Sequence, residues 1–393
     1  MALPELLERL VTTPGPSGQE RAAAAVWREA AAPVGEVSSD AMGNSWVRVP
    51  GTAGGPSLAL VGHIDEIAVV VTNLGDDGLA AVRPGSGWDP NVMVGQRVDV
   101  LTRNGAVPGV VAMKQQKRKP GTERKAVERD DLVLDVGASD GDELRSLIRP
   151  GDNVIWHGAP LALQGNRVAS RAFDNRMGCY VALESARRIA EGGGAPGDVI
   201  AVAAVMEEVG DFAGSRTAAY SIEPDLAVAI DVTHATDVRG GDADEEGKVV
   251  MGGGPTISRG PSIHEDVFEL LYDTAERESI PLVVEVSPRG STSTDADAVY
   301  ISRAGVPTGL VSVPLRYMHS PIDARHRRSR ARGAAGRGVR AQARAWHELR
   351  WLSWKRDSFG HRLGSPDAVW QAQRRPRRAC RDRARRDCDP RRA

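Results

Sequence analysis

The sequence predicts an α/β fold built on a mixed sheet, with a smaller β-rich region inserted into it. Two short apolar segments, Val199–Val205 and Leu226–Ile230, are rich in β-branched residues and match strands buried on both faces. From residue 67 to residue 164 the pattern changes to short strand-like segments separated by turns of Gly, Asp and Pro. The α/β pattern resumes near Ser170. One domain interrupted by another accounts for this order.

Size and composition favour a soluble protein of the cell interior. The 393 residues suffice for two domains, and no apolar segment is long enough to cross a membrane. The N-terminal segment lacks the basic start and cleavage site of a signal peptide. The three cysteines (Cys179, Cys380 and Cys388) match neither a disulfide framework nor a zinc ribbon. We therefore expect a reduced, cytoplasmic protein.

The first part of the α/β domain is assigned to residues 1–66. Helices are expected at Pro4–Leu10 and Glu20–Ala32, and Ser17 with Glu20 has the spacing of a capping box for the second helix. Strands are expected at Asn44–Val49 and Ser57–Asp65. This part therefore supplies two helices and the first strands of the sheet.

The inserted β-rich region is assigned to residues 67–164 and the second part of the α/β domain to residues 165–323. Strands in the insertion are expected at Ala68–Thr72, Gln96–Leu101, Val107–Met113 and Asn153–His157. Beyond it, the remaining expected elements are helices at Asn175–Glu191, Ile263–Glu278 and Asp297–Ala304 and strands at Leu282–Val286 and Thr308–Val313.

Acidic and histidine side chains follow several of these strands. Ligands of open α/β sheets bind just beyond the carboxyl ends of the strands, and poorly solvated carboxylates there need a partner such as a cation. The candidates are His63, Asp65, Asp174, Glu207, Glu208, Asp231 and His319. Taken singly, each also has a structural interpretation: a solvated loop at Glu207–Glu208, a turn at Asp231, or a helix N-cap at Asp174.

Two histidines and several acids together suit a pair of divalent ions. Imidazole nitrogen and carboxylate oxygen favour Zn²⁺, Co²⁺ or Mn²⁺ over Mg²⁺ or Ca²⁺. Two such ions about 3.5–4 Å apart bind a shared hydroxide and polarise a substrate carbonyl. Of two adjacent glutamates, one can be a ligand while the other acts as general base. Asp65 lies two residues after His63 on an extended chain, so it can accept a hydrogen bond from the second ring nitrogen of His63. The chemistry indicated is hydrolysis of an amide bond.

Seven motifs in order give the chain a resemblance to a known family, the M42 metallo-aminopeptidases, which include glutamyl and tetrahedral aminopeptidases. The motifs are PGPSGQE (14–20), GHIDEI (62–67), AFDNRMG (172–178), EEVGDFAGS (207–215), AIDVTHATD (229–237), STDADA (293–298) and PLRYMHSP (314–321). The resemblance implies a zinc-peptidase catalytic domain and a PDZ-like inserted domain that helps assemble dimers into hollow dodecamers. It also implies a cis peptide bond between Asp174 and Asn175.

The resemblance implies a role for each candidate residue. The first metal ion is expected on His63, Asp174 and Asp231. The second ion is expected on Asp174, Glu208 and His319, so that Asp174 bridges the pair. Glu207 matches the general base and Asp65 the residue that orients His63. Ala68 and Met206 replace the family's usual glycine and glutamine beside these positions, and we expect altered rather than lost activity.

The C-terminal region, residues 324–393, departs from the family. It contains 22 Lys and Arg against 6 Asp and Glu, which leaves 29 basic and 46 acidic residues in the rest of the chain. The amphipathic helix that follows HSP in the family is replaced by an Arg-rich segment. We interpret this tail as an aberrant, frameshift-like and disordered extension. Because the family's helix is missing, we expect part of the sheet to be uncovered. A basic arm for nucleic acid or other acidic partners is the alternative that we favour less.

The leading functional hypothesis is a dinuclear aminopeptidase that removes N-terminal residues from short peptides and assembles into homo-oligomers. A related co-catalytic amidohydrolase, such as a carboxypeptidase or deacylase, is the alternative enzyme. A requirement for a free substrate amine would distinguish the two. A distant alternative is nucleic-acid binding through the tail. A glycosidase is disfavoured because it needs two carboxylates flanking a sugar rather than a metal pair.

Overall fold

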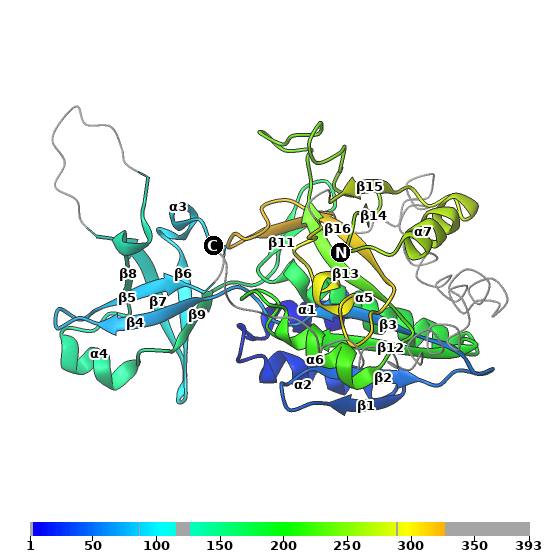
Figure 1. The fold of residues 1–393 in the computed structure, drawn as a ribbon. Helices are drawn as coiled ribbons and strands as arrows, with labels where there is room; N and C mark the ends of the chain where they lie inside the picture. Colours follow the sequence, from blue (N-terminus) through cyan, green and yellow to red (C-terminus); the bar gives the residue numbers. More distant parts are fainter. Residues whose placement is uncertain (1–2, 86, 115–125, 288–289, 327–393) are drawn as a thin grey trace, which may run out of the picture. The chain divides into compact units, whose positions relative to one another are not determined.

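The computed structural model describes residues 3–85, 87–114, 126–287 and 290–326, and its main feature is an eight-stranded mixed sheet (Figure 1). In sheet order the strands are β1 (Glu36–Ser39), β2 (Ser45–Val49), β12 (Gly197–Ala204), β3 (Gly55–His63), β13 (Leu226–His234), β16 (Thr308–Leu315), β14 (Thr256–Arg259) and β15 (Val283–Val286). Strands β12, β3, β13 and β16 run parallel, whereas β2 and β14 pair antiparallel with β12 and β16. The predicted mixed α/β fold is confirmed.

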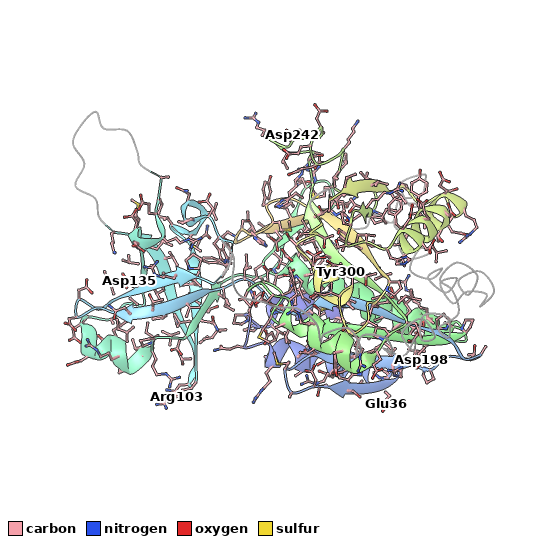
Figure 2. The ribbon with its side chains drawn as sticks, in the orientation of Figure 1. Glu36, Arg103, Asp135, Asp198, Asp242 and Tyr300 are labelled. Atoms are coloured by element: carbon pink, nitrogen blue, oxygen red, sulfur yellow. The ribbon has the colours of Figure 1, made fainter. Side chains whose placement is uncertain are left out.

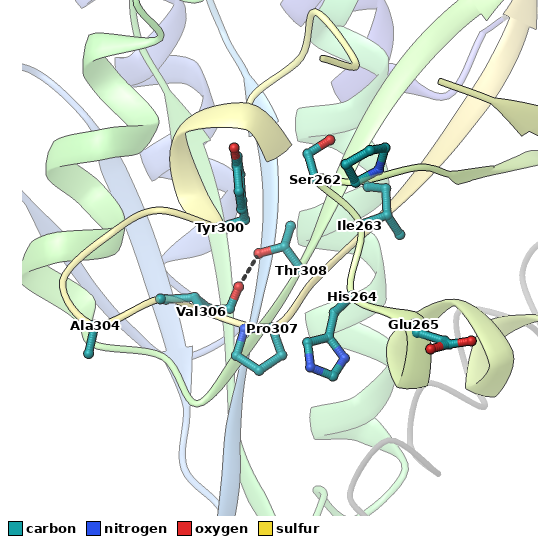
Figure 3. A pocket seen from close by; sticks show the side chains of 11 residues that line it. Ser262, Ile263, His264, Glu265, Tyr300, Ala304, Val306, Pro307 and Thr308 are labelled. Atoms are coloured by element: carbon teal, nitrogen blue, oxygen red, sulfur yellow. Dashed lines mark hydrogen bonds between the residues drawn. The ribbon is translucent and has the colours of Figure 1, made fainter. Parts of the chain in front are cut away.

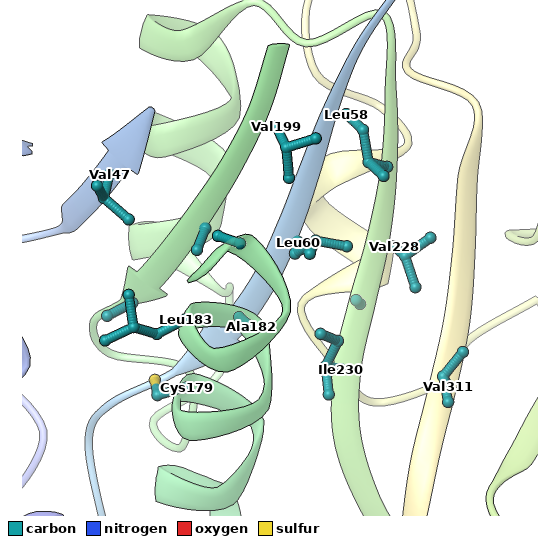
Figure 4. Packing of buried hydrophobic residues seen from close by; sticks show 14 of the residues in the cluster. Val47, Leu58, Leu60, Cys179, Ala182, Leu183, Val199, Val228, Ile230 and Val311 are labelled. Carbon is teal, nitrogen blue, oxygen red and sulfur yellow. The ribbon is translucent and has the colours of Figure 1, made fainter. Parts of the chain in front are cut away.

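Helices pack on both faces of this sheet because its central strands are apolar on both sides. On β3, Leu58 and Leu60 belong to the core shared with α2 (Arg21–Ala31), α5 (Phe173–Glu191) and α7 (Glu265–Arg277) (Figure 4). The alternate residues Ala59 and Val61 pack with α6 (Ala213–Ile222) on the opposite face. Successive side chains of a strand point to opposite faces, so continuous apolar segments can serve two helical layers.

The start of α5 lies directly against the central strands. A Cβ atom on Gly62 of β3 would lie 2.6 Å from the backbone nitrogen of Cys179, and one on Gly178 would overlap the carbonyl oxygen of Ile230. Only glycine allows this approach of two backbones. It brings the first turn of α5 beside the carboxyl ends of β3 and β13.

An ion pair joins β2 to β12 at their shared border. Arg48 Nη1 lies 2.5 Å from Asp198 Oδ2. Asp198, whose position is labelled in Figure 2, also accepts the N–H of Gly51 at 2.8 Å. Both side chains are about one-third exposed, at 33% and 35%. The pair therefore links the antiparallel strand β2 to β12, the first of the parallel strands.

The inserted region forms a closed six-stranded barrel with its own apolar core. Around the barrel the strands are β4 (Val69–Leu74), β5 (Leu79–Pro84), β8 (Leu132–Asp135), β7 (Gly105–Met113), β6 (Arg97–Thr102) and β9 (Asn153–Trp156). Trp88 packs edge-on against Trp156, with ring centroids 4.7 Å apart. Strands β5 and β8, which are short and contain Ala, Pro and Asp, were not predicted from the sequence. Nor were the helices α3 (Pro90–Met93) and α4 (Gly141–Leu147).

A second, three-stranded sheet crosses two of the expected domain boundaries. It consists of β10 (Leu161–Leu163), β11 (Arg167–Ser170) and β17 (Asp323–His326). Strand β10 was assigned to the insertion, yet it pairs with β11 of the α/β part. The expected tail boundary at Ala324 falls within β17, whose pairing with β11 gives these backbone groups partners. Residues 327–393 lie outside the described part, so the rest of the tail hypothesis remains a prediction.

The N-terminal helices α1 (Glu5–Thr12) and α2 form close to their expected positions. The predicted capping box is wrong. Glu20 is the N-cap of α2 without a side-chain cap, and the hydroxyl of Ser17 donates instead to Asp65, Oγ to Oδ2 2.6 Å. None of the helices in the described ranges has the length and apolar character needed to span a bilayer.

Candidate active site

The candidate residues meet at one edge of the main sheet because three parallel strands end there. His63 is the last residue of β3, in register with Ala204 at the end of β12, and Glu207 and Glu208 follow β12 directly. Asp231 lies in β13 next to β3. The side chains of His63, Asp174, Glu207, Glu208 and Asp231 are all buried. The edge is thus lined with buried carboxylates around one imidazole.

Asp174 lies between two histidines. Its Oδ1 is 3.2 Å from His63 Nε2, and its Oδ2 is 3.5 Å from His319 Nε2. His319 follows β16 and is 39% exposed, whereas His63 is 1% exposed. One carboxylate therefore divides the site into an enclosed half and a half that reaches solvent.

The ligand-type atoms cluster around these two halves. His63, Asp174 and Asp231 each place one donor atom within 4.8 Å of the others, and Asp174, Glu208 and His319 do the same. A third such group consists of His63, Glu207 and Glu208. Glu207 Oε2 lies 3.5 Å from His63 Nε2, and Glu208 Oε2 lies 3.4 Å from His319 Nε2. The first two groups share Asp174, so each could hold one ion of a pair.

Asp65 connects this cluster to the chain around it. Its Oδ1 lies 3.3 Å from His63 Nδ1 and accepts the N–H of Glu207, while its Oδ2 accepts the N–H of Glu208 and the hydroxyl of Ser17. Burial alone would raise the pKa of Asp65, but His63 and these hydrogen bonds lower it below its usual value. Asp65 is therefore an anion that holds both the imidazole and the Glu207–Glu208 backbone.

The charges of the site indicate whether bound cations would be stabilised there. None of its carboxylates is paired with a Lys or Arg of the described ranges. Burial raises the pKa of Glu207 to about 11 and that of Asp231 to about 8, although the nearby His63 opposes both shifts. Burial and the Asp174 charge likewise raise the pKa of Glu208 well above its usual value. Divalent ions would supply the missing positive charge, so this donor set fits them.

Comparison with known proteins identifies the family. The model of the M42 glutamyl aminopeptidases matches residues 43–333. The chain belongs to this family. It is accordingly an aminopeptidase, a hydrolase of peptides, and the resemblance drawn from its motifs is confirmed.

Two relatives illustrate the match of this M42 peptidase in sequence and structure. It is 32% identical over 331 residues to a lysyl aminopeptidase of Pyrococcus furiosus, covering 81% of this chain and 91% of the relative. It superposes with a TM-score of 0.80 and 30% identity on a TET aminopeptidase of a marine-sediment Thaumarchaeota archaeon, covering 88% and 94% of the two chains. The likeness thus spans nearly the whole length of both relatives.

The structure brings together all seven residues singled out in the sequence. The solvated-loop interpretation of Glu207 and Glu208 is wrong because both side chains are buried. The helix-cap interpretation of Asp174 is also wrong, since Ala172 is the N-cap of α5 and Asp174 has non-helical dihedral angles in its first turn. The peptide bond between Asp174 and Asn175 is cis, as the resemblance implied. Their catalytic roles remain predictions.

Two buried carboxylates near the site were not singled out in the sequence. Asp323 of β17 accepts the N–H of Asp174 at 3.3 Å, and burial together with Asp174 raises its pKa well above its usual value. Asp295 is 1% exposed, and burial raises its pKa to about 6 against the influence of His63. Asp295 could have been found from the sequence, because it lies inside the STDADA motif that contributed to the family resemblance. Asp323 had none, because it lies two residues past the last motif.

Proposed function

We propose that this M42 peptidase removes N-terminal residues from short peptides with two divalent ions held in the shared site. His63, Asp174 and Asp231 would hold one ion, and Asp174, Glu208 and His319 the other. The observation that carries the proposal is the position of Asp174, whose two oxygens face two different histidines at 3.2 and 3.5 Å. A bridging carboxylate is a natural link between two ions.

When bound, such ions polarise the scissile carbonyl and lower the pKa of water. Glu207 is the proposed general base. It is the acid of the cluster that is left over once both ligand sets are filled, and its Oε2 lies 3.5 Å from His63 Nε2. Its carboxylate would take a proton from the attacking water and deliver it to the leaving amine. Asp65 would hold the imidazole of His63 in place through the 3.3 Å contact with Nδ1.

The donor set also limits the choice of metal. Each proposed set has one imidazole and two carboxylates, which suits Zn²⁺ or Co²⁺, with Mn²⁺ as a further candidate. Ca²⁺ and Mg²⁺ favour sites made of oxygen alone. Reconstitution should therefore be carried out with each of the three transition-metal ions.

We also propose that the protein forms homo-oligomers based on a dimer. One similar structure, a TET1 peptidase of Pyrococcus horikoshii, can assemble into a tetrahedron or a large octahedral shell; it is 26% identical with a TM-score of 0.72, over 89% of this chain and 99% of that one. The closed barrel occupies the place of the PDZ-like dimerisation domain in the expected architecture. We propose this role for the barrel, assembly of the dimers into a dodecamer, and the cytoplasm as the location of the protein.

Hydrolysis of a panel of aminoacyl-p-nitroanilides by metal-loaded protein tests the proposed activity. Glu207→Gln should abolish turnover while keeping both ions. Glu184→Gln is the matched control, because Glu184 is a partly buried glutamate of α5 that pairs with Arg187 and Arg188. An N-acetylated substrate should resist cleavage. Cleavage of the acetylated substrate would instead favour the related amidohydrolase.

A separate binding assay tests the distant alternative, nucleic-acid binding through the tail. Salt-sensitive binding that disappears on truncation after His326, which keeps β17, would support it.

A further inference from the structure

Asp237 and Arg316 form an ion pair that belongs to neither of the proposed metal-ligand sets. The Nε and Nη2 atoms of Arg316 lie 3.1 and 2.6 Å from the two carboxylate oxygens of Asp237, and Nη2 also donates to the Asp237 backbone carbonyl at 2.8 Å. Arg316 is 16% exposed and Asp237 24%. Two parallel hydrogen bonds of this kind fix the relative geometry of both side chains. The pair therefore joins the end of the AIDVTHATD motif to the PLRYMHSP motif that contains His319.

The chain reaches this pair along β16, which is held from its first residue to its last. β16 follows the short helix α8 (Ala296–Val299), and the hydroxyl of Thr308 at its start donates to the carbonyl of Val306 at 2.8 Å (Figure 3). Every residue from Thr308 to Leu315 then pairs with β13. Arg316 comes next in the chain, so the ion pair begins where the strand pairing ends.

Asp237 is likewise held by the residues that precede it. The N–H of Ala235 donates to the carbonyl of Leu315 at 2.7 Å, and the N–H of Thr236 donates to the carbonyl of Val249 at 2.8 Å. Burial alone would raise the pKa of Asp237, but Arg316 lowers it below its usual value, so the carboxylate is ionised at neutral pH. Asp237 is therefore a charged anchor just beyond the end of β13.

Residues 317–322 form a loop that leads from Arg316 into β17 and carries His319. Arg316 and Ala324 close this loop, because each donates its N–H to the carbonyl of the other, at 2.9 and 2.8 Å. Within the loop, Tyr317 and His319 have φ angles of 65° and 57°. Residues other than glycine rarely adopt this left-handed conformation and keep it where their surroundings impose it. The conformation of the loop therefore depends on contacts with other segments.

Two such contacts lie at the two ends of the loop. The ion pair is at its start, and at its end Asp323 accepts the N–H of Asp174 at 3.3 Å. Between them, Nε2 of His319 lies 3.5 Å from Asp174 and 3.4 Å from Glu208. The ring of His319 is 39% exposed, whereas His63 is buried. Surrounding side chains thus enclose His319 less than His63, so its position depends more on how the loop is anchored.

We propose that Asp237 and Arg316 are positioning residues for His319. Their ion pair would hold the loop so that the imidazole stays beside the two carboxylates that it faces. The inference rests on the proposed function, in which His319 is a ligand of the second ion. Loss of the pair should therefore weaken binding of the ion on His319 and leave the ion on His63 in place.

Zinc titration of the metal-free full chain in competition with a chelator tests the proposal. Asp237→Asn keeps the size of the side chain but loses its charge, so it should weaken binding of the ion on His319 at least about tenfold and leave the other ion unchanged. His319→Ala identifies which binding step belongs to that ion. Arg316→Lys cannot form the two parallel hydrogen bonds and should act in the same direction. Because both variants break the same contact, the double variant should bind no more weakly than the weaker single variant.

Asp198→Asn is the matched control. Asp198 also accepts hydrogen bonds from an arginine and a backbone N–H, but it lies near the start of β12, at the opposite end of that strand from the site. It should leave both zinc affinities unchanged. Equal weakening of both ions in Asp237→Asn would indicate a general effect on the fold and overturn the proposal. Unchanged zinc affinities in both Asp237→Asn and Arg316→Lys would overturn it as well.

Hydrogen exchange in the metal-free chain distinguishes failure of this proposal from failure of the proposed function. The N–H groups of Arg316 and Ala324 should exchange faster in Asp237→Asn than in the wild type, and Asp198→Asn should leave their rates unchanged. Unchanged exchange in Asp237→Asn would overturn the positioning role. Binding of fewer than two zinc ions by the wild type would instead contradict the proposed function, and the exchange rates would still decide whether the ion pair holds the loop.

Discussion

The guanidinium of Arg176 lies 3.3 Å from the carboxylate of Glu66, Nη2 to Oε1, and both side chains are buried. The other terminal nitrogen of Arg176 donates to the carbonyl oxygens of Leu10 and Thr13 at 2.7 and 3.1 Å. Glu66 directly follows Asp65, and Arg176 lies two residues after Asp174. This contact therefore ties the N-terminal segment to both chain segments that carry the candidate site.

Replacing Arg176 with Met should strongly destabilise the protein. The variant leaves the carbonyl oxygens of Leu10 and Thr13 without a donor and removes one of the positive partners of Glu66. We expect a loss of about 3–5 kcal/mol in the free energy of unfolding, as for other broken buried pairs. Denaturant unfolding measures it.

The control for Arg176 is an arginine whose ion pairs lie nearer the solvent. Arg187 is 42% exposed and pairs with Glu184 one turn away on α5. Arg187→Met should cost no more than about 1 kcal/mol because solvent screens the pair. Similar losses in both variants would show that the buried network contributes no more than a surface ion pair.

Ser17→Ala should weaken metal binding without removing a ligand. The Ser17 hydroxyl donates to Asp65 at 2.6 Å, and Asp65 in turn contacts His63. Loss of such an outer partner typically lowers metal affinity by about 10–100-fold. Competition with a chelator measures the affinity. Ser57→Ala is the control, because its hydroxyl also donates to an aspartate, Asp225, at the surface. Equal affinities in the two variants would contradict a positioning role for Ser17.

The Arg48–Asp198 pair should make a small, pH-dependent contribution to stability. The Gly51 N–H lowers the pKa of Asp198, and Arg48 acts in the same direction against the effect of burial. The folded state therefore binds protons less readily than the unfolded state, so the stabilisation is present above about pH 4 and is lost as the pH falls further.

Comparison of the wild type with Asp198→Asn isolates this contribution. At neutral pH the variant should be less stable by no more than about 1 kcal/mol, because the pair is one-third exposed. The difference should shrink as the pH falls below the usual pKa of Asp, about 3.9. Urea unfolding at a series of pH values measures it. A difference that stays constant from neutral to acid pH would exclude this origin.

Much of the site could be predicted from sequence because local pattern determines where a strand ends. His63, Glu207 and Asp231 each follow an apolar segment, and parallel strands bring their carboxyl ends to one edge. The order of motifs then supplied Asp174 and His319. The family and the mixed sheet followed from the same residues.

The missed features depend on contacts between distant segments. Asp323 approaches Asp174 only because β17 pairs with β11, which no local pattern indicates. Ser17 had the spacing of a helix cap, yet Asp65, 48 residues later, takes its hydroxyl. The closure of the barrel required β8, a four-residue strand with little pattern of its own. In each case a contact with a distant segment of the chain overrides or completes what the local sequence predicts.

His319→Ala should remove one ion and leave the other. His319 contacts only the half of the cluster that contains Glu208 and Asp174, at 3.4 and 3.5 Å. We expect the amount of tightly bound metal to fall from two ions to one per chain. The loss of affinity at the second site should exceed the roughly 10–100-fold loss that follows removal of a residue that only contacts a ligand. Elemental analysis after dialysis counts the ions. His157→Ala is the control, since His157 is exposed and bonded to Asp99 of the barrel. Retention of two tightly bound ions by His319→Ala would exclude His319 as a ligand.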